Sequence, residues 1–146
     1  MNRKKSILII VSNYYEEIAN NLIEETKKVI EENNTLYQIE KVTGVFEIPS
    51  IVSFSKHSFD GYVTLGCVIR GETSHYDYVC SESARALMDL SLEGLAIGYG
   101  IVTVENYEQA IIRSKTLANK GLGKGKVAAL ACLNQINLKI KYTNGT

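Results

Sequence analysis

The sequence has no net charge, no long apolar run and only one proline. Its sixteen Lys and Arg residues balance sixteen Asp and Glu residues, so it lacks the basic excess with which proteins hold nucleic acid. No apolar stretch approaches the ~20 residues that span a membrane. The run Ile7 to Val11, which follows the basic residues 3–5, is too short for a signal-peptide core. We therefore expect no nucleic-acid partner and no membrane partner.

Cysteine is also scarce, and the spacing of the three cysteines does not match that of a metal site. Cys67, Cys80 and Cys132 form an odd set, and the chain contains neither CxxC nor HExxH. Both motifs are the usual signatures of zinc sites in proteins. We expect reduced thiols, a cytoplasmic location and no metal site.

Apolar runs alternate with amphipathic segments along the whole chain. The pattern predicts strands at 6–11, 36–42, 62–68 and 95–103, a short helix at Pro49, and helices at 14–33, 74–93, 106–119 and 125–138. Nearly continuous apolar strands are typical of a parallel sheet covered on both faces. The predicted fold is a single α/β domain over 1–146, a three-layer α/β/α sandwich with a four-stranded parallel sheet in a flavodoxin-like arrangement.

Residues 66–79, GCVIRGETSHYDYV, are the most informative segment. They begin at the end of a predicted strand and lead into a predicted helix, with His75 at the junction. Ligands bind beyond the carboxyl ends of the strands in open α/β sheets, and the backbone N–H groups of a helix start suit a phosphate. The segment therefore predicts an anion site beside a titratable histidine.

Other loops at the same sheet edge carry Tyr14, Glu47 and further polar groups. Each residue alone has a structural interpretation: Glu47 can complement a helix dipole, Arg113 can lie on a solvated helix face, and His75 can cap a helix. The lysine- and glycine-rich stretch 119–126 matches neither GxxxxGK[ST] nor a dinucleotide fingerprint after a strand. The loops together suit a planar polar ligand plus an anionic one.

Four motifs, in order and spanning almost the whole chain, resemble those of the 6,7-dimethyl-8-ribityllumazine synthase family. They are VTGVFEIP at 42–49, LGCVIRGETSHYDYV at 65–79, GIVT to EQAIIR over 100–113, and KGKVAA at 124–129. The resemblance implies the penultimate step of riboflavin synthesis. In that reaction 5-amino-6-(D-ribitylamino)uracil condenses with 3,4-dihydroxy-2-butanone 4-phosphate, and phosphate and water are released, without a metal or organic cofactor.

The resemblance also assigns roles to residues. His75 is the proton-transfer residue, which suits a group titrating near neutral pH. The phosphate-binding residues are Gly71, Glu72, Thr73 and Arg113. The residues for the pyrimidine and ribityl chain are Tyr14, Val45, Phe46, Glu47, Cys67, Val68, Ile69, Tyr99 and Lys124. In the family the positions of Tyr99, Arg113 and Lys124 belong to a neighbouring subunit, so the resemblance implies active sites between subunits, and riboflavin synthase is a further possible partner.

The chain departs from the family pattern in places. Asn13, Tyr15 and Thr43 replace residues common in the family, and 114–123 is longer than the usual turn by roughly three residues. Either Lys120 or Lys124 can occupy the position of the family's site lysine. The number of residues between the lysine and Ala128 favours Lys124. Longer turns accompany simple pentamers in the family, so we expect a homopentamer rather than a decamer or sixty-subunit shell. A flavin-binding relative without turnover and a flavodoxin-like nucleotide-binding domain remain alternatives.

Overall fold

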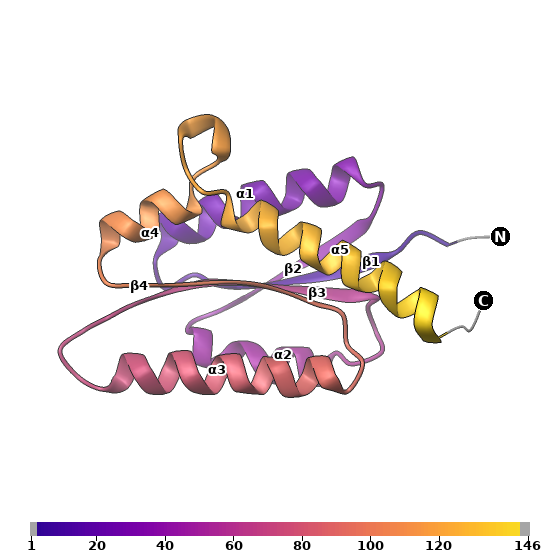
Figure 1. The fold of residues 1–146 in the computed structure, drawn as a ribbon, viewed down its shortest axis with the longest axis horizontal. Coiled ribbons are helices and arrows are strands. Elements are labelled where there is room, and N and C mark those ends of the chain that lie inside the picture. Colours follow the sequence, from indigo (N-terminus) through magenta and orange to yellow (C-terminus); the bar gives the residue numbers. More distant parts are fainter. Residues whose placement is uncertain (1–2, 144–146) are drawn as a thin grey trace.

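The computed structural model describes residues 3–143 and contains one parallel sheet (Figure 1). Its strands are β1 (Ser6–Ser12), β2 (Leu36–Val42), β3 (Gly61–Ile69) and β4 (Ile97–Val104), in the order β2-β1-β3-β4. All three pairings are parallel. The predicted four-stranded parallel sheet and α/β class are confirmed.

Helices cover both faces of this sheet (Figure 1). One face carries α1 (Glu16–Glu32), α4 (Tyr107–Ser114) and α5 (Lys124–Thr143), and the other carries α2 (Ile48–Phe54) and α3 (His75–Leu92). Two short 3₁₀ turns, η1 (Val45–Glu47) and η2 (Leu117–Asn119), precede α2 and α5. Among residues 3–143, no helix is long and apolar enough to cross a membrane.

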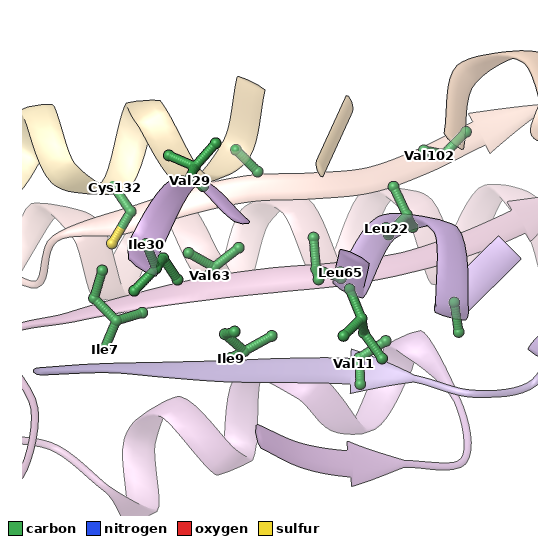
Figure 2. Close-up of a cluster of buried hydrophobic side chains, with 14 of the residues drawn as sticks. Ile7, Ile9, Val11, Leu22, Val29, Ile30, Val63, Leu65, Val102 and Cys132 are labelled. Carbon is green, nitrogen blue, oxygen red and sulfur yellow. The ribbon is translucent and has the colours of Figure 1, made fainter. Parts of the chain in front are cut away.

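The apolar runs of the strands supply two cores, because successive side chains point to opposite faces. Ile7, Ile9 and Val11 pack with α1 and α5 (Figure 2), whereas Leu8 and Ile10 pack with α2 and α3. Burying each such side chain stabilises the fold by roughly 1.5–3 kcal/mol. The continuous hydrophobicity of β1 is therefore explained by the two helix layers.

Close packing of α5 against the sheet depends on glycine. A Cβ added to Gly98 in β4 would lie 2.0 Å from the carbonyl oxygen of Ala128 in α5. A Cβ on Gly125 would lie 2.4 Å from the carbonyl oxygen of Leu22 in α1. The missing side chains let α5 approach both the sheet and its neighbouring helix.

Several predicted boundaries were wrong. The helix predicted at 106–119 ends at Ser114, because Lys115 is extended and Gly121 and Gly123 donate backbone hydrogen bonds back to Thr116 and Lys115. The predicted helix 125–138 continues to Thr143, the helix predicted from residue 14 begins at Glu16, and the fourth strand begins at Ile97. The apolar periodicity located every strand and α-helix and both ends of β2, but it missed η2 and most of the other ends.

Candidate active site

Loops from the carboxyl ends of β1, β2 and β3 surround a hollow of about 360 Å³, called here the His75 hollow. The first two loops are joined, since the Ser12 hydroxyl donates to the Thr43 carbonyl at 2.9 Å and the Asn13 N–H donates to the Val42 carbonyl at 3.0 Å. The structure brings eight of the predicted site residues to this hollow: Tyr14, Val45, Phe46, Glu47, Cys67, Val68, Ile69 and His75.

Tyrosines form one wall of the His75 hollow. Tyr14 is 69% exposed, and its ring meets Tyr15 edge-on, with centroids 4.9 Å apart. Tyr15 in turn meets Tyr107 at 6.2 Å, and the Tyr107 hydroxyl donates to Glu17 at 2.9 Å. Burial raises the pKa of Tyr15. Tyr15 lines the hollow but was not predicted as a site residue; its only signal was its departure from the family pattern.

The turn η1 forms the opposite wall. Val45 is buried, and a Cβ on Gly66 would lie 2.7 Å from its Cγ2, so glycine in β3 lets this turn settle on the sheet. Phe46 remains exposed. The Glu47 Oε1 accepts a hydrogen bond from the Gly44 N–H at 3.1 Å. This bond holds the carboxylate at the rim of the hollow, where its other oxygen can accept a ligand hydroxyl.

The end of β3 forms the floor through Cys67, Val68 and Ile69. Burial, followed by the proximity of Cys80, raises the pKa of the Cys67 thiol to about 11. The thiol is therefore protonated at neutral pH and is a poor nucleophile. The floor offers an apolar surface rather than a reactive sulfur.

Beyond the floor, an exposed turn containing Gly71, Glu72 and Thr73 leads into α3, whose first residue is His75. The Thr73 Oγ1 accepts a hydrogen bond from the His75 N–H at 3.2 Å. The helix spans 18 residues, and the N–H groups of its first turn carry partial positive charge. An anion beside Thr73 would meet these groups.

The remaining predicted residues lie elsewhere. Tyr99 in β4, Arg113 in α4 and Lys124 at the start of α5 line a second hollow of about 300 Å³, called here the Arg113 hollow. Burial raises the pKa of Tyr99, and the Arg113 Nη1 donates to the Gln109 carbonyl at 3.5 Å. Lys120 adopts a left-handed backbone with φ of 65° and does not line this hollow.

The two hollows share no lining residue. One chain thus presents an aromatic surface with a histidine at one place and a basic surface at the edge strand β4 at another. Among the described residues, no cluster of three or more His, Cys, Asp or Glu could hold a metal ion. The arrangement can bind an aromatic ring, accept hydrogen bonds and transfer a proton, and it offers cations on a separate surface.

These features define a parallel α/β protein with a ligand site at the carboxyl end of its sheet. The family model for 6,7-dimethyl-8-ribityllumazine synthase matches residues 4–140. Proteins of that name from Bartonella tribocorum and Agrobacterium fabrum are 43% and 42% identical, covering 97% and 94% of this chain and 95% and 97% of their own. One from Zymomonas mobilis is 41% identical, over 93% of this chain and 97% of its own. The chain belongs to the 6,7-dimethyl-8-ribityllumazine synthase family of enzymes.

Proposed function

We propose that this protein condenses 5-amino-6-(D-ribitylamino)uracil with 3,4-dihydroxy-2-butanone 4-phosphate to give 6,7-dimethyl-8-ribityllumazine, releasing phosphate and water. The observation that carries the proposal is the division of chemistry between the two hollows. The His75 hollow has the aromatic wall, the carboxylate and the histidine, while the Arg113 hollow has the cations that a phosphorylated substrate requires. Of residues 3–143, no lysine or arginine lines the His75 hollow, and no histidine or carboxylate lines the Arg113 hollow.

The pyrimidine of the first substrate binds in the His75 hollow. Tyr14 stacks on the ring, and its hydroxyl remains in water, where it needs no protein partner. The backbone of Cys67, Val68 and Ile69, which forms the floor of the hollow, borders the ring. The free oxygen of Glu47 accepts hydrogen bonds from the ribityl hydroxyls beside Val45 and Phe46.

The phosphate of the second substrate binds at the turn before α3, with Gly71, Glu72 and Thr73. A Cβ at Gly71 would meet no heavy atom within 4 Å, and Gly71 is not among the glycines with positive φ. Nothing among residues 3–143 therefore requires glycine there. Close approach of a ligand to the backbone gives a reason for it, and the positive end of the α3 dipole favours an anion there.

His75 moves the protons. The amine of the pyrimidine attacks the ketone, the carbinolamine loses water to an imine, phosphate leaves, and the ring closes with loss of water. Each step takes a proton from one atom and gives it to another, and imidazole can do both near neutral pH. His75 lines the same hollow as Cys67, Val68 and Ile69, and it begins α3 directly after the turn at 71–74. No cofactor is required for this sequence.

The site is completed between subunits, which we propose form a homopentamer. A second copy places Tyr99, Arg113 and Lys124 against the His75 hollow of the first. Large exposed apolar side chains on α2 and α3 support such self-association; they include Phe54, Tyr78, Met88 and Leu92. The Arg113 that the second copy supplies pairs with the phosphate of the bound substrate and with the phosphate that leaves.

Light scattering tests the pentamer. A particle near a megadalton would instead indicate a shell.

We place the protein in the cytoplasm. Its three cysteines are free, and two of them, Cys67 and Cys132, are buried with pKa values raised by burial to about 11 and about 12. Buried protonated thiols of this kind behave as small apolar side chains. Labelling the cysteines before and after cell lysis, in the folded protein and in denaturant, would show whether they stay reduced.

One assay tests the function. Both substrates are mixed with the protein, and lumazine absorbance and phosphate release are followed together. We expect equal amounts of lumazine and phosphate at a rate above that of the spontaneous reaction. Binding of the lumazine product without any such rate would indicate the alternative, a binding protein that holds the ligand without turnover.

A further inference from the structure

Arg70 connects the two hollows of one chain. It follows β3 directly, and its backbone N–H donates to the Val104 carbonyl at 2.9 Å, which extends the β3–β4 pairing by one residue. The next residue, Gly71, begins the turn at 71–73 that we propose binds phosphate, called here the phosphate turn. The position of Arg70 thus sets where this turn leaves the sheet.

The Arg70 side chain contacts two separate elements. Its Nε donates to the Glu105 Oε2 at 2.7 Å, on the loop between β4 and α4. Its Nη1 donates to the Asp77 Oδ1 at 3.3 Å, in the first turn of α3, and the guanidinium carbon lies 4.3 Å from the centre of the Tyr76 ring. One planar group therefore joins the helix that begins with His75 to the loop that leads into α4.

The connection continues along α4 to the Arg113 hollow. The Glu105 N–H donates to the Gln109 Oε1 at 2.8 Å, and the Gln109 carbonyl accepts from the Arg113 Nη1 at 3.5 Å. The Asn106 side chain caps the same helix by accepting from the Gln109 N–H at 2.9 Å. Polar contacts through Glu105 and Gln109 therefore connect Arg70, the residue before Gly71, to the arginine of the other hollow.

We propose that Arg70 is a positioning residue that holds the phosphate turn and His75 in register with α4 and Arg113. The inference rests on the proposed function. Because the two hollows of one chain serve different active sites in the assembly, Arg70 also links adjacent sites. Each contact is exposed and adds little to stability by itself; its effect is on the placement of reacting groups, where an error of about 1 Å can cost up to about 10²-fold in rate.

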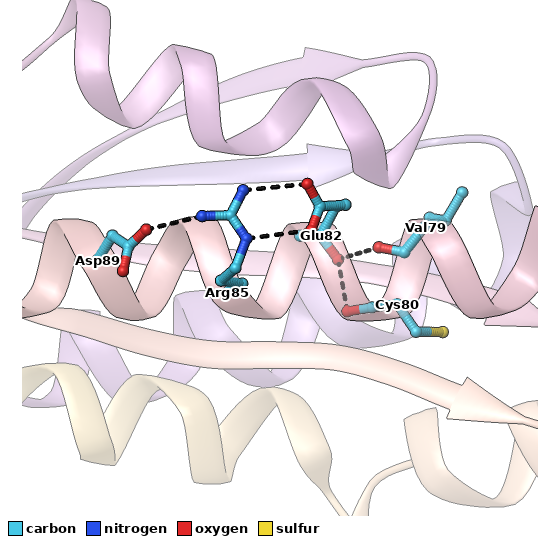
Figure 3. A network of polar contacts seen from close by, with 6 residues as sticks. Val79, Cys80, Glu82, Arg85 and Asp89 are labelled. Atoms are coloured by element: carbon cyan, nitrogen blue, oxygen red, sulfur yellow. Dashed lines mark hydrogen bonds and ion pairs between the residues drawn. The ribbon is translucent and has the colours of Figure 1, made fainter.

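Arg85 provides a matched control (Figure 3). It also bonds two carboxylates, Glu82 and Asp89, both at 3.0 Å, and its side chain is 60% exposed against 45% for Arg70. Both of its partners lie in α3, so it joins no second element. Loss of Arg85 removes the same kind of ion pairs without separating the phosphate turn from α4.

The test compares Arg70→Ala, Arg70→Lys, Glu105→Gln and Arg85→Ala in the assembled enzyme. We expect Arg70→Ala to raise KM for the phosphate substrate and lower kcat by about ten-fold or more, with its melting temperature unchanged. Arg70→Lys should not restore activity, because an ammonium cannot donate to two carboxylates in one plane or stack on Tyr76 in the same way. Glu105→Gln should act in the same direction, and Arg70→Ala/Glu105→Gln should be no worse than Arg70→Ala alone. Arg85→Ala should behave as wild type.

Hydrogen exchange in the absence of substrate gives a second readout. We expect faster exchange of the amides at 71–76 in Arg70→Ala and Glu105→Gln, and unchanged exchange there in Arg85→Ala. A fully active Arg70→Lys would show that only its charge matters, and wild-type kinetics in Arg70→Ala would show no role; either result overturns the proposal. Absence of turnover in the wild type would defeat the proposed function instead, and the exchange comparison would still decide the role of Arg70 in holding the turn.

Discussion

The two ends of the sheet are built differently. At the amino end, Asp60 accepts hydrogen bonds from the Ser6 N–H at 2.8 Å and from both terminal nitrogens of Arg3 at 2.8 and 2.6 Å. At the carboxyl end, Tyr14 and Phe46 are exposed, and so are His75 and the turn at 71–74 that precedes it. The amino end is closed by an ion pair within the chain, while the carboxyl end keeps large side chains exposed around a hollow that a ligand can enter, as expected for an open α/β sheet.

Two glycines give the sharpest test of this difference, with the largest expected effect. Gly98→Ala places a Cβ 2.0 Å from the Ala128 carbonyl oxygen, so α5 must shift, and we expect a loss of about 3 kcal/mol in the free energy of unfolding. The Cβ of Gly71→Ala meets no atom of the described residues within 4 Å beyond its chain neighbours, so this change should leave stability unchanged while raising KM for the phosphate substrate. Urea titration and steady-state kinetics measure the two effects. Equal destabilisation by both changes would break the contrast between the two ends.

His75→Ala should have the next largest effect. We expect kcat to fall by about 100-fold or more, because proton transfer by a positioned group contributes at least this much, which is close to 2.7 kcal/mol of barrier. Binding of the ribitylaminouracil should weaken much less, and the melting temperature should stay the same. Stopped-flow turnover and equilibrium binding test this. A parallel loss in binding and in kcat would make the histidine a binding group.

Arg113→Ala should produce a smaller change, confined to one substrate. We expect KM for the phosphate substrate to rise by about ten-fold, since a charge-assisted hydrogen bond contributes about 1.5–3 kcal/mol, with little change for the pyrimidine. Lys120→Ala and Lys124→Ala form a matched pair, of which only Lys124→Ala should affect kinetics. At a concentration of the phosphate substrate below KM, where both variants are slow, mixing Arg113→Ala with His75→Ala chains should give more activity than the two variants give separately if the two hollows meet between subunits. No restored activity after subunit exchange would place both groups in one chain.

The sequence predicted the sheet better than it predicted the site. Alternating apolar segments identify four strands and their parallel pairing, because burial on both faces leaves a direct mark on composition. The ends of helices depend on local hydrogen bonds, which periodicity does not encode; here Gly121 and Gly123 donate to the carbonyls of Thr116 and Lys115. Within the site, motif spacing located His75 beside its hollow, whereas Tyr15 and Arg70 act through tertiary contacts with Tyr107 and Glu105. Contacts between loops distant in sequence have no local signal.

The ion pair at the amino end of the sheet should make the stability of the fold depend on pH. The hydrogen bond from Arg3 lowers the pKa of Asp60 below its ordinary value of 3.8, against the opposing effect of burial. A carboxyl group with a lowered folded-state pKa stabilises the fold above its unfolded pKa, and this contribution is lost as the pH falls through the folded-state pKa. Asp60→Asn should therefore lower the melting temperature by a few degrees at pH 7, and this difference should shrink as the pH falls below about 4.

The control for this smallest effect is Glu93→Gln, which removes the carboxylate of the exposed Lys56–Glu93 pair at 2.7 Å. Exposed pairs contribute little, so the melting temperature of this variant should match wild type at every pH. Asp60 differs because its side chain is only 19% exposed and also binds the start of β1 through the Ser6 N–H. If Asp60→Asn kept its full difference from wild type at pH 2, the stabilisation would come from shape and not from charge. Turnover of Asp60→Asn should equal wild type, because the ion pair lies at the end of the sheet opposite the His75 hollow.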